Sequence, residues 1–76
     1  MKIQILGTGC AKCKKLLSAV ETAVGDLGVD AEIEKVEDIK DIAQMGVMST
    51  PALAVDGEVV AAGKVLTPEQ IKDYLQ

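Results

Sequence analysis

The chain has 76 residues, a formal net charge of -4 and 49% hydrophobic residues, with Tyr74 as its only aromatic side chain. This hydrophobic content excludes a disordered chain, and the length allows one domain, residues 1–76, with an aliphatic core. An acidic chain without a basic stripe excludes a nucleic-acid partner, and no apolar run approaches the ~20 residues that a membrane span needs. The N-terminal run is too short and too interrupted for a signal peptide, which predicts a cytoplasmic protein with no membrane partner.

The first half of the chain is predicted to form a strand, a long helix and a second strand. Lys2 to Leu6 alternates polar and apolar residues, as half-buried strands do. Gly28 suits the left-handed position that ends the helix, and Asp30 to Val36 is a more polar strand whose charges favour a sheet edge. The apolar residues with helical spacing are Cys13, Leu16, Leu17, Val20, Val24 and Leu27.

The middle of the chain predicts a short helix and a hairpin. Asp38 is the expected N-cap of the helix, Gly46 ends it, and its apolar residues are Ile39, Ile42 and Ala43. Two apolar runs follow, Ala52 to Val55 and Glu58 to Ala62. They are joined by Asp56-Gly57, a dipeptide typical of two-residue type I′ turns.

The last segment predicts a helix that begins at a capping box. Thr67 is the N-cap, Pro68 takes the first helical position, and Gln70 completes the box. Leu66 and Ile71 occupy the two hydrophobic staple positions, and Ile71, Tyr74 and Leu75 are expected to form the buried face. The order βαβαββα predicts an α/β fold in which helices pack against a four-stranded mixed sheet.

The two cysteines, Cys10 and Cys13, are separated by Ala11-Lys12 and fall between the first strand and the first helix. Gly7 and Gly9 let the chain turn out of that strand. Free amides and the helix dipole stabilise a thiolate at a helix start, so the pKa of Cys10 is expected below that of a free thiol. Nearby lysines add a smaller contribution.

Cys13, one turn further on, is expected to be the more buried of the pair. This asymmetry suits thiol–disulfide exchange, in which Cys10 attacks a disulfide and Cys13 resolves the mixed disulfide. Two thiolates also suit soft metal ions such as Cu(I) or Zn(II), and cysteines pack as small hydrophobic side chains as well. The spacing at a helix start favours chemistry over simple packing.

Three segments resemble the thioredoxin/glutaredoxin fold, and in particular the very small prokaryotic thioredoxin-like proteins called redox-active disulfide proteins. They are "ILGTGCAKC", "STPALAVDGEVVAAG" and "TPEQIKDYL". The resemblance covers essentially the whole chain. It implies a minimal thioredoxin, glutaredoxin-like fold with helices on both faces of the sheet.

The resemblance also implies the roles of individual residues. Pro51 is expected to be cis and to lie beside the cysteines, and Thr50 is expected to offer its backbone to an extended substrate. Gly63 leaves room near the site, and Thr8 and Ala11 complete the expected substrate contacts. The implied activity is that of a thiol–disulfide oxidoreductase, which reduces disulfides in a partner protein or small molecule. A small thiol or a flavin-dependent reductase would donate the electrons, and no bound cofactor or metal is needed.

Some features depart from mainstream thioredoxins, because no Trp precedes Cys10 and no Gly-Pro separates the cysteines. The rival class is a soft-metal (Cu/Zn) carrier. Heavy-metal-associated domains have a similar cysteine loop, although Thr8 stands where they usually have Met. Those domains end with a strand, whereas Thr67 to Gln70 predicts a helix, so the last element discriminates between the two classes. A weaker alternative is a thiol-containing subunit that binds protein without turnover.

Overall fold

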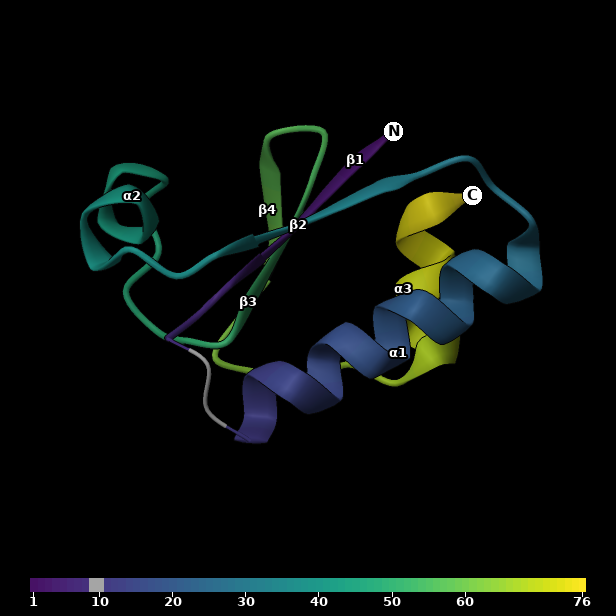
Figure 1. Cartoon of the computed structure of the whole chain (residues 1–76), viewed down its shortest axis with the longest axis horizontal. Coiled ribbons are helices and arrows are strands. Elements are labelled where there is room, and N and C mark those ends of the chain that lie inside the picture. The colour runs from purple at the N-terminus through teal and green to yellow at the C-terminus, as the bar shows by residue number, and fades with distance from the viewer. Residues whose placement is uncertain (9–10) are drawn as a thin grey trace.

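The computed structural model describes residues 1–8 and 11–76, and its elements follow the predicted order βαβαββα (Figure 1). The strands are β1 (Lys2–Leu6), β2 (Glu32–Val36), β3 (Ala52–Val55) and β4 (Glu58–Ala62). The helices are α1 (Ala11–Leu27), α2 (Ile39–Gln44) and α3 (Pro68–Leu75). Within the described residues, no helix is both long enough and apolar enough to cross a membrane.

Within the described part of the chain, four strands form one mixed sheet in the order β2-β1-β3-β4. β1 pairs in parallel with β2 and antiparallel with β3, and β3 pairs antiparallel with β4. β2 lies at an edge, as its charges indicated, although it begins at Glu32 and not at Asp30. Leu6 pairs with both Val36 and Ala52, so the end of β1 meets the end of β2 and the start of β3. We call this end of the strands, where Leu6, Val36 and Ala52 meet, the site end.

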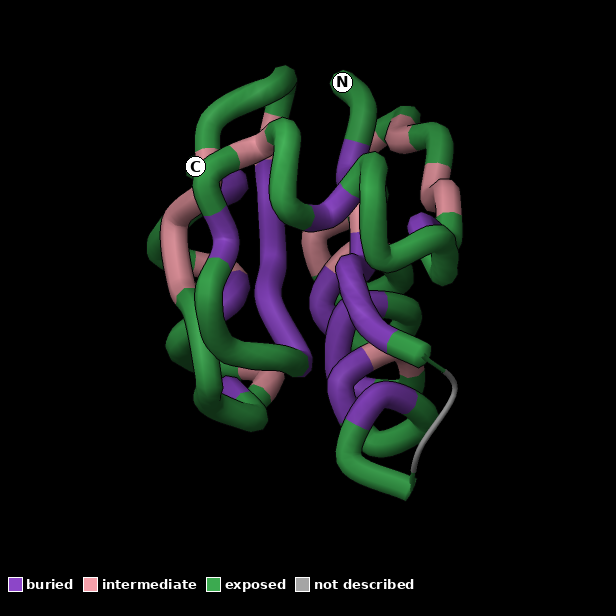
Figure 2. The backbone as a smooth tube through the Cα atoms, turned by 90° about the vertical axis from the view of Figure 1, so that its left-hand side faces the viewer, coloured by how far each residue is buried: buried purple, intermediate pink, exposed green. Residues whose placement is uncertain are grey.

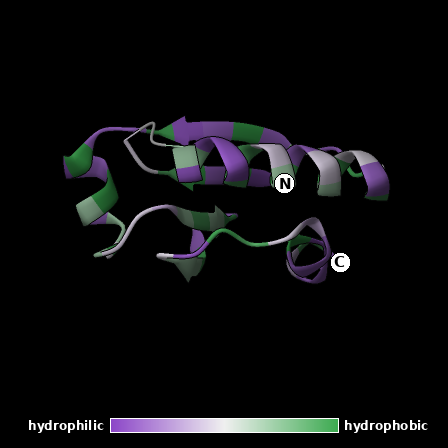
Figure 3. Ribbon diagram, turned by 90° about the horizontal axis from the view of Figure 1, so that it is seen from below, coloured by the Kyte–Doolittle hydropathy of each residue, from purple (hydrophilic) through white to green (hydrophobic). Residues whose placement is uncertain are grey.

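The larger core lies between the sheet and the helices α1 and α3. Ile3, Ile5 and Leu53 all face this side, because alternate residues of a strand point the same way. The tube in Figure 2 shows that the buried segments lie along the strands and the inner faces of the helices. α1 is amphipathic, and its ribbon alternates between hydrophilic and less polar segments in Figure 3. The helical residues that complete this core are Leu16, Ala19, Val20, Ala23, Ile71 and Leu75.

A smaller core lies on the opposite face of the sheet, under α2. Ile42 is the buried residue of this short helix. It packs in a cluster made mostly of strand and loop residues: Leu6, Val36, Val47, Ala52 and Ala54. Helices therefore cover both faces of the sheet, as the resemblance implied.

The turn and the helix caps form as the local sequence predicts. Asp56 and Gly57 have φ values of 51° and 85°, so both central residues of the hairpin are left-handed, as type I′ requires. The Gln70 amide donates to the Thr67 hydroxyl, and the Thr67 amide donates to the Gln70 side-chain oxygen, which completes the capping box. The Asp38 carboxylate caps α2 by accepting a hydrogen bond from the amide of Lys40.

Two apolar side chains do not take part in the cores as expected. Tyr74 is 46% exposed, so the buried face of α3 consists of Ile71 and Leu75. These two residues are four apart and lie on one line of the helix, whereas Tyr74 lies to one side and stays about half exposed. Ile39 is 70% exposed, because the single buried side of the six-residue helix α2 is taken by Ile42.

Both ends of the chain lie far from the site end. The amide of Lys2 donates to the carboxylate of Asp56 at 2.8 Å, and the amide of Asp56 donates to the carbonyl oxygen of Lys2 at 2.7 Å. These bonds hold the start of β1 to the hairpin turn. Figure 1 shows the N and C labels on the same side of the molecule, away from the start of α1.

Candidate active site

Cys13 lies in the first turn of α1 and is buried, with 7% of its surface exposed. Burial of this cysteine was predicted from its place on the apolar stripe of the helix. Cys10, the predicted nucleophile, lies outside the described residues.

Gly7 leaves the space that the Cys13 sulfur needs. Its amide donates to the carbonyl oxygen of Val36 at 2.9 Å, so the residue extends the pairing of β1 with β2. A Cβ added to Gly7 would overlap Sγ of Cys13 and would stand 3.8 Å from Cα of Pro51. Gly7 is not among the residues with positive φ. A glycine is required here by the closeness of Cys13, and not by the turn that the sequence suggested.

Pro51 lies on the other side of this contact. The Thr50–Pro51 peptide bond is cis, which confirms the conformation that the resemblance implied. Pro51 is fully buried, whereas Thr50 is exposed. The carbonyl oxygen of Pro51 accepts a hydrogen bond of 2.8 Å from the amide of Gly63. This bond joins the start of β3 to the residue after β4, and the pairing of Ala52 with Leu6 places Pro51 next to the end of β1, close to Gly7 and Cys13.

Gly63 packs against the loop that leads to Pro51. Its φ is +73°, and a Cβ at this position would stand 3.1 Å from Cβ of Ser49. Both the backbone conformation and the available space therefore favour glycine. Gly63 therefore packs closely against the loop before Pro51, and its expected role beside the site stays a prediction.

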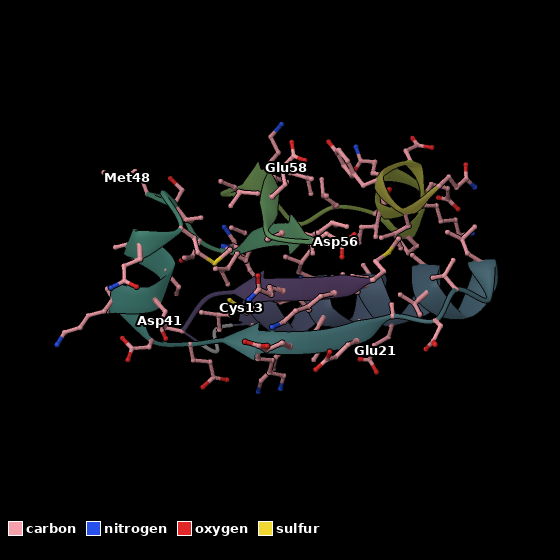
Figure 4. All side chains as sticks on the ribbon, turned by 90° about the horizontal axis from the view of Figure 1, so that it is seen from above. Cys13, Glu21, Asp41, Met48, Asp56 and Glu58 are labelled. Carbon is pink, nitrogen blue, oxygen red and sulfur yellow. The ribbon has the colours of Figure 1, made fainter. Side chains whose placement is uncertain are left out.

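The structure brings Thr8 and Thr50 together in one shallow pocket of about 290 Å³. α2 and the loop after it supply the other residues of this pocket: Ile39, Ile42, Ala43, Val47 and Met48. Met48 is 96% exposed and projects outward near α2 in Figure 4. Ala11, the remaining predicted contact residue, is exposed as the first residue of α1.

A second pocket, of about 210 Å³, reaches Cys13 between α1 and β2. Its apolar lining includes Ile5 and Leu17, and its charged residues are Lys14, Lys35 and Glu37. This pocket was not predicted from the sequence. The available signal was the strand alternation that places Lys35 and Glu37 on the same side of the chain as Ile5 of the paired strand.

Lys2 and Glu34 form an ion pair outside the site, and each shifts the pKa of the other. Nζ of Lys2 lies 3.0 Å from Oε2 of Glu34, at the end of the sheet far from Cys13. A hydrogen bond from Lys2, together with its charge, lowers the pKa of Glu34, and the same two effects raise the pKa of Lys2. Both side chains are exposed enough for the solvent to weaken their interaction.

The fold and the site define a thioredoxin-like protein, in which a cysteine at the start of α1 lies beside a cis-proline at the start of β3. The sequence model of the thioredoxin domain matches residues 1–76, and the chain belongs to this family. It is 48% identical over 75 residues to a thioredoxin of Methanothermobacter thermautotrophicus, covering 99% of this chain and 97% of the relative. It is 46% identical over 74 residues to a thioredoxin of Methanocaldococcus jannaschii, covering 97% of this chain and 85% of the relative.

The element that follows β4 distinguishes this class from the soft-metal carriers. In heavy-metal-associated domains a strand stands in this place. Here the chain forms the helix α3, as the capping box at Thr67 predicted. The structure and the family comparison agree on the thioredoxin-like class, and the comparison does not support the metal carrier.

Proposed function

We propose that this protein is a thiol–disulfide oxidoreductase that uses Cys10 and Cys13 to reduce disulfide bonds in partner proteins. Membership of the thioredoxin-domain family supports the reaction class. The observation that carries the proposal is the position of Cys13, which is buried at the start of α1 against Gly7 and close to Pro51.

The reaction transfers two electrons from the dithiol to the substrate. The Cys10 thiolate attacks one sulfur of the substrate disulfide and forms a mixed disulfide, and the released substrate thiolate takes up a proton. Cys13 then loses its proton and attacks the sulfur of Cys10. A Cys10–Cys13 disulfide forms, and the second substrate thiolate leaves and is protonated. Because Cys13 is shielded from solvent, it reacts with the nearby mixed disulfide in preference to external disulfides.

The exposed residues around this point position the substrate. Thr50 precedes the buried Pro51, so its backbone is available to an extended segment of the partner. Thr8 lines the same shallow pocket as Thr50. Ala11 is the first residue of α1, and Gly63 lies in the loop after β4. A small thiol or a flavin-dependent reductase regenerates the dithiol, and the protein works in the cytoplasm.

A trapping experiment tests this function. Cys13→Ser removes the resolving thiol, so the variant should accumulate a mixed disulfide with a disulfide-containing protein such as insulin, detected as an adduct by intact-mass spectrometry. The matched control is Cys10→Ser, which keeps one cysteine but loses the nucleophile and should form little adduct. Equal trapping by both variants, or none by either, would contradict the assigned roles.

A further inference from the structure

The charged residues of α1 are distributed in the opposite way to the one that the helix dipole favours. Its first turn has no acidic residue, and three lysines, Lys12, Lys14 and Lys15, lie within its first five positions. Its last turn has no basic residue, and its second half carries Glu21 and Asp26. The helix dipole favours the opposite arrangement, with acidic residues at the start and basic residues at the end.

The structure compensates this arrangement at only one end of α1. Asp26 pairs with Lys72 of α3, with 3.0 Å between Oδ2 and Nζ. The other ion pair of residues 1–8 and 11–76 joins Lys2 to Glu34, so the lysines at the start of α1 have no acidic partner there. An uncompensated departure from a local preference is expected at a functional or strained site.

β2 adds a further lysine beside the same site. Lys14 of α1 and Lys35 of β2 both line the pocket that reaches Cys13, and Glu37 is the acidic residue of that pocket. We name Lys12, Lys14, Lys15 and Lys35 the lysine surface. All four are exposed.

Acidic residues lie on the second half of α1 and at the hairpin turn, away from the lysine surface, and a further acidic group, Glu37, Asp38 and Asp41, lies at the site end on the side of α2. Figure 4 shows Glu21 beyond Cys13 along α1, while Asp56 and Glu58 lie at the hairpin turn. This turn is at the end of the sheet opposite Leu6 and Ala52. An acidic protein therefore presents a cationic surface on one side of its site, at the start of α1 and on β2 beside Cys13.

We propose that the lysine surface selects partner proteins whose disulfide is flanked by acidic residues. This inference rests on the proposed function and names the substrate class of the same site. The reaction is unchanged: the partner's disulfide gains two electrons and two protons, and the Cys10–Cys13 dithiol loses them. In water, the attraction between one lysine and one carboxylate about 10 Å apart raises the encounter rate roughly twofold. Because the effects of several pairs multiply, several lysines can distinguish acidic from basic partners.

The test compares three synthetic peptides that share one disulfide loop and differ only in its flanking residues, which are glutamates, serines or lysines. Prereduced protein is mixed with each peptide, and the rate of peptide reduction is measured in single turnover by chromatography. At an ionic strength of about 10 mM the acidic peptide should react roughly tenfold faster than the basic one. At about 0.5 M salt the difference should fall below about twofold, because the charges are screened.

A pair of charge-matched variants locates the effect. Lys12→Gln/Lys15→Gln removes two charges of the lysine surface and leaves the pocket residue Lys14 in place. Thr22→Glu/Gln76→Glu lowers the net charge equally, at exposed positions far from the site. At low salt the ratio of the rates for the acidic and the basic peptide should be roughly fivefold smaller in the first variant than in the unchanged protein. In the second variant this ratio should stay the same.

The outcomes separate this inference from the function on which it rests. Reduction of all three peptides at equal rates at low salt would overturn the inference and leave the function intact. Equal loss of preference in both variants would also overturn it, because net charge alone would then explain the effect. If the serine-flanked peptide is not reduced under any condition, the proposed function itself fails.

Discussion

The substitution Gly7→Ala directly tests the packing that holds Cys13. The added methyl group would overlap Sγ of Cys13, while Cα of Pro51, at 3.8 Å, is in ordinary contact range. The conformation of Gly7 does not forbid alanine, because its φ is not positive. The effect of the substitution should therefore come from the displaced sulfur and not from a strained backbone.

The expected loss of stability combines two opposing effects. Forcing a methyl group into a packed site costs about 2 kcal/mol, and part of this is the displacement of the sulfur from its rotamer. Replacing glycine by alanine lowers the conformational entropy of the unfolded chain, which stabilises the folded state by about 0.7 kcal/mol. The net loss is about 1.3 kcal/mol, which for a chain of this length lowers Tm by about 5–10 °C.

Denaturant unfolding in excess reductant measures this loss without a contribution from a disulfide. The decisive comparison uses the Cys13→Ala background, in which Cβ remains but Sγ is absent. Cβ of residue 13 would lie 3.6 Å from the new methyl group, an ordinary contact. On this background Gly7→Ala should be neutral or slightly stabilising, which gives a coupling energy of about 2 kcal/mol. If Gly7→Ala costs the same on both backgrounds, the sulfur is not the group that excludes a side chain.

Three further predictions concern other parts of the chain. Gly25 lies in α1, and a Cβ there meets no atom within 4 Å, so Gly25→Ala should raise the free energy of unfolding by about 0.7 kcal/mol. If Gly25→Ala instead lowered the free energy of unfolding, the position would not be open to a side chain. Thr67→Ala removes the acceptor for the Gln70 amide and should cost about 1 kcal/mol in denaturant unfolding, whereas an unchanged midpoint would show that the cap adds nothing. Glu34 has a lowered pKa because Lys2 binds its carboxylate. The stability from this pair is therefore present above the unfolded pKa and is lost as pH falls through the folded one. In an NMR titration, Lys2→Gln should raise the pKa of Glu34 toward its ordinary value; an unshifted titration would mean that the pair does not persist in solution.

The features predictable from the sequence are those that depend on a few adjacent residues. The turn at Asp56-Gly57 requires two left-handed residues, and this dipeptide supplies them. The capping box at Thr67 is likewise formed by residues within one turn. The cis bond before Pro51 was implied only by resemblance, because X–Pro bonds are cis in just about 5–6% of cases.

The features missed depend on how distant segments meet. The need for glycine at Gly7 appears only when α1 and the start of β3 are placed against β1. Helical spacing allowed Tyr74 to be buried, but the way in which α3 meets α1 leaves it exposed. The pocket beside Cys13 combines residues of β1, α1 and β2, and although strand alternation places Lys35 on the side of Ile5, its closeness to Cys13 appears only once α1 is packed on the sheet.

The placement of the chain ends has a practical consequence. β1 begins at the hairpin turn, where Lys2 and Asp56 exchange hydrogen bonds, and α3 ends on the same side of the molecule (Figure 1). A linker, an affinity handle or a surface attachment at either terminus would leave the site end of the sheet, where Cys13 and Pro51 lie, uncovered. The fold is therefore suited to immobilisation on a solid support, or to fusion with a second protein, with its reactive side unobstructed.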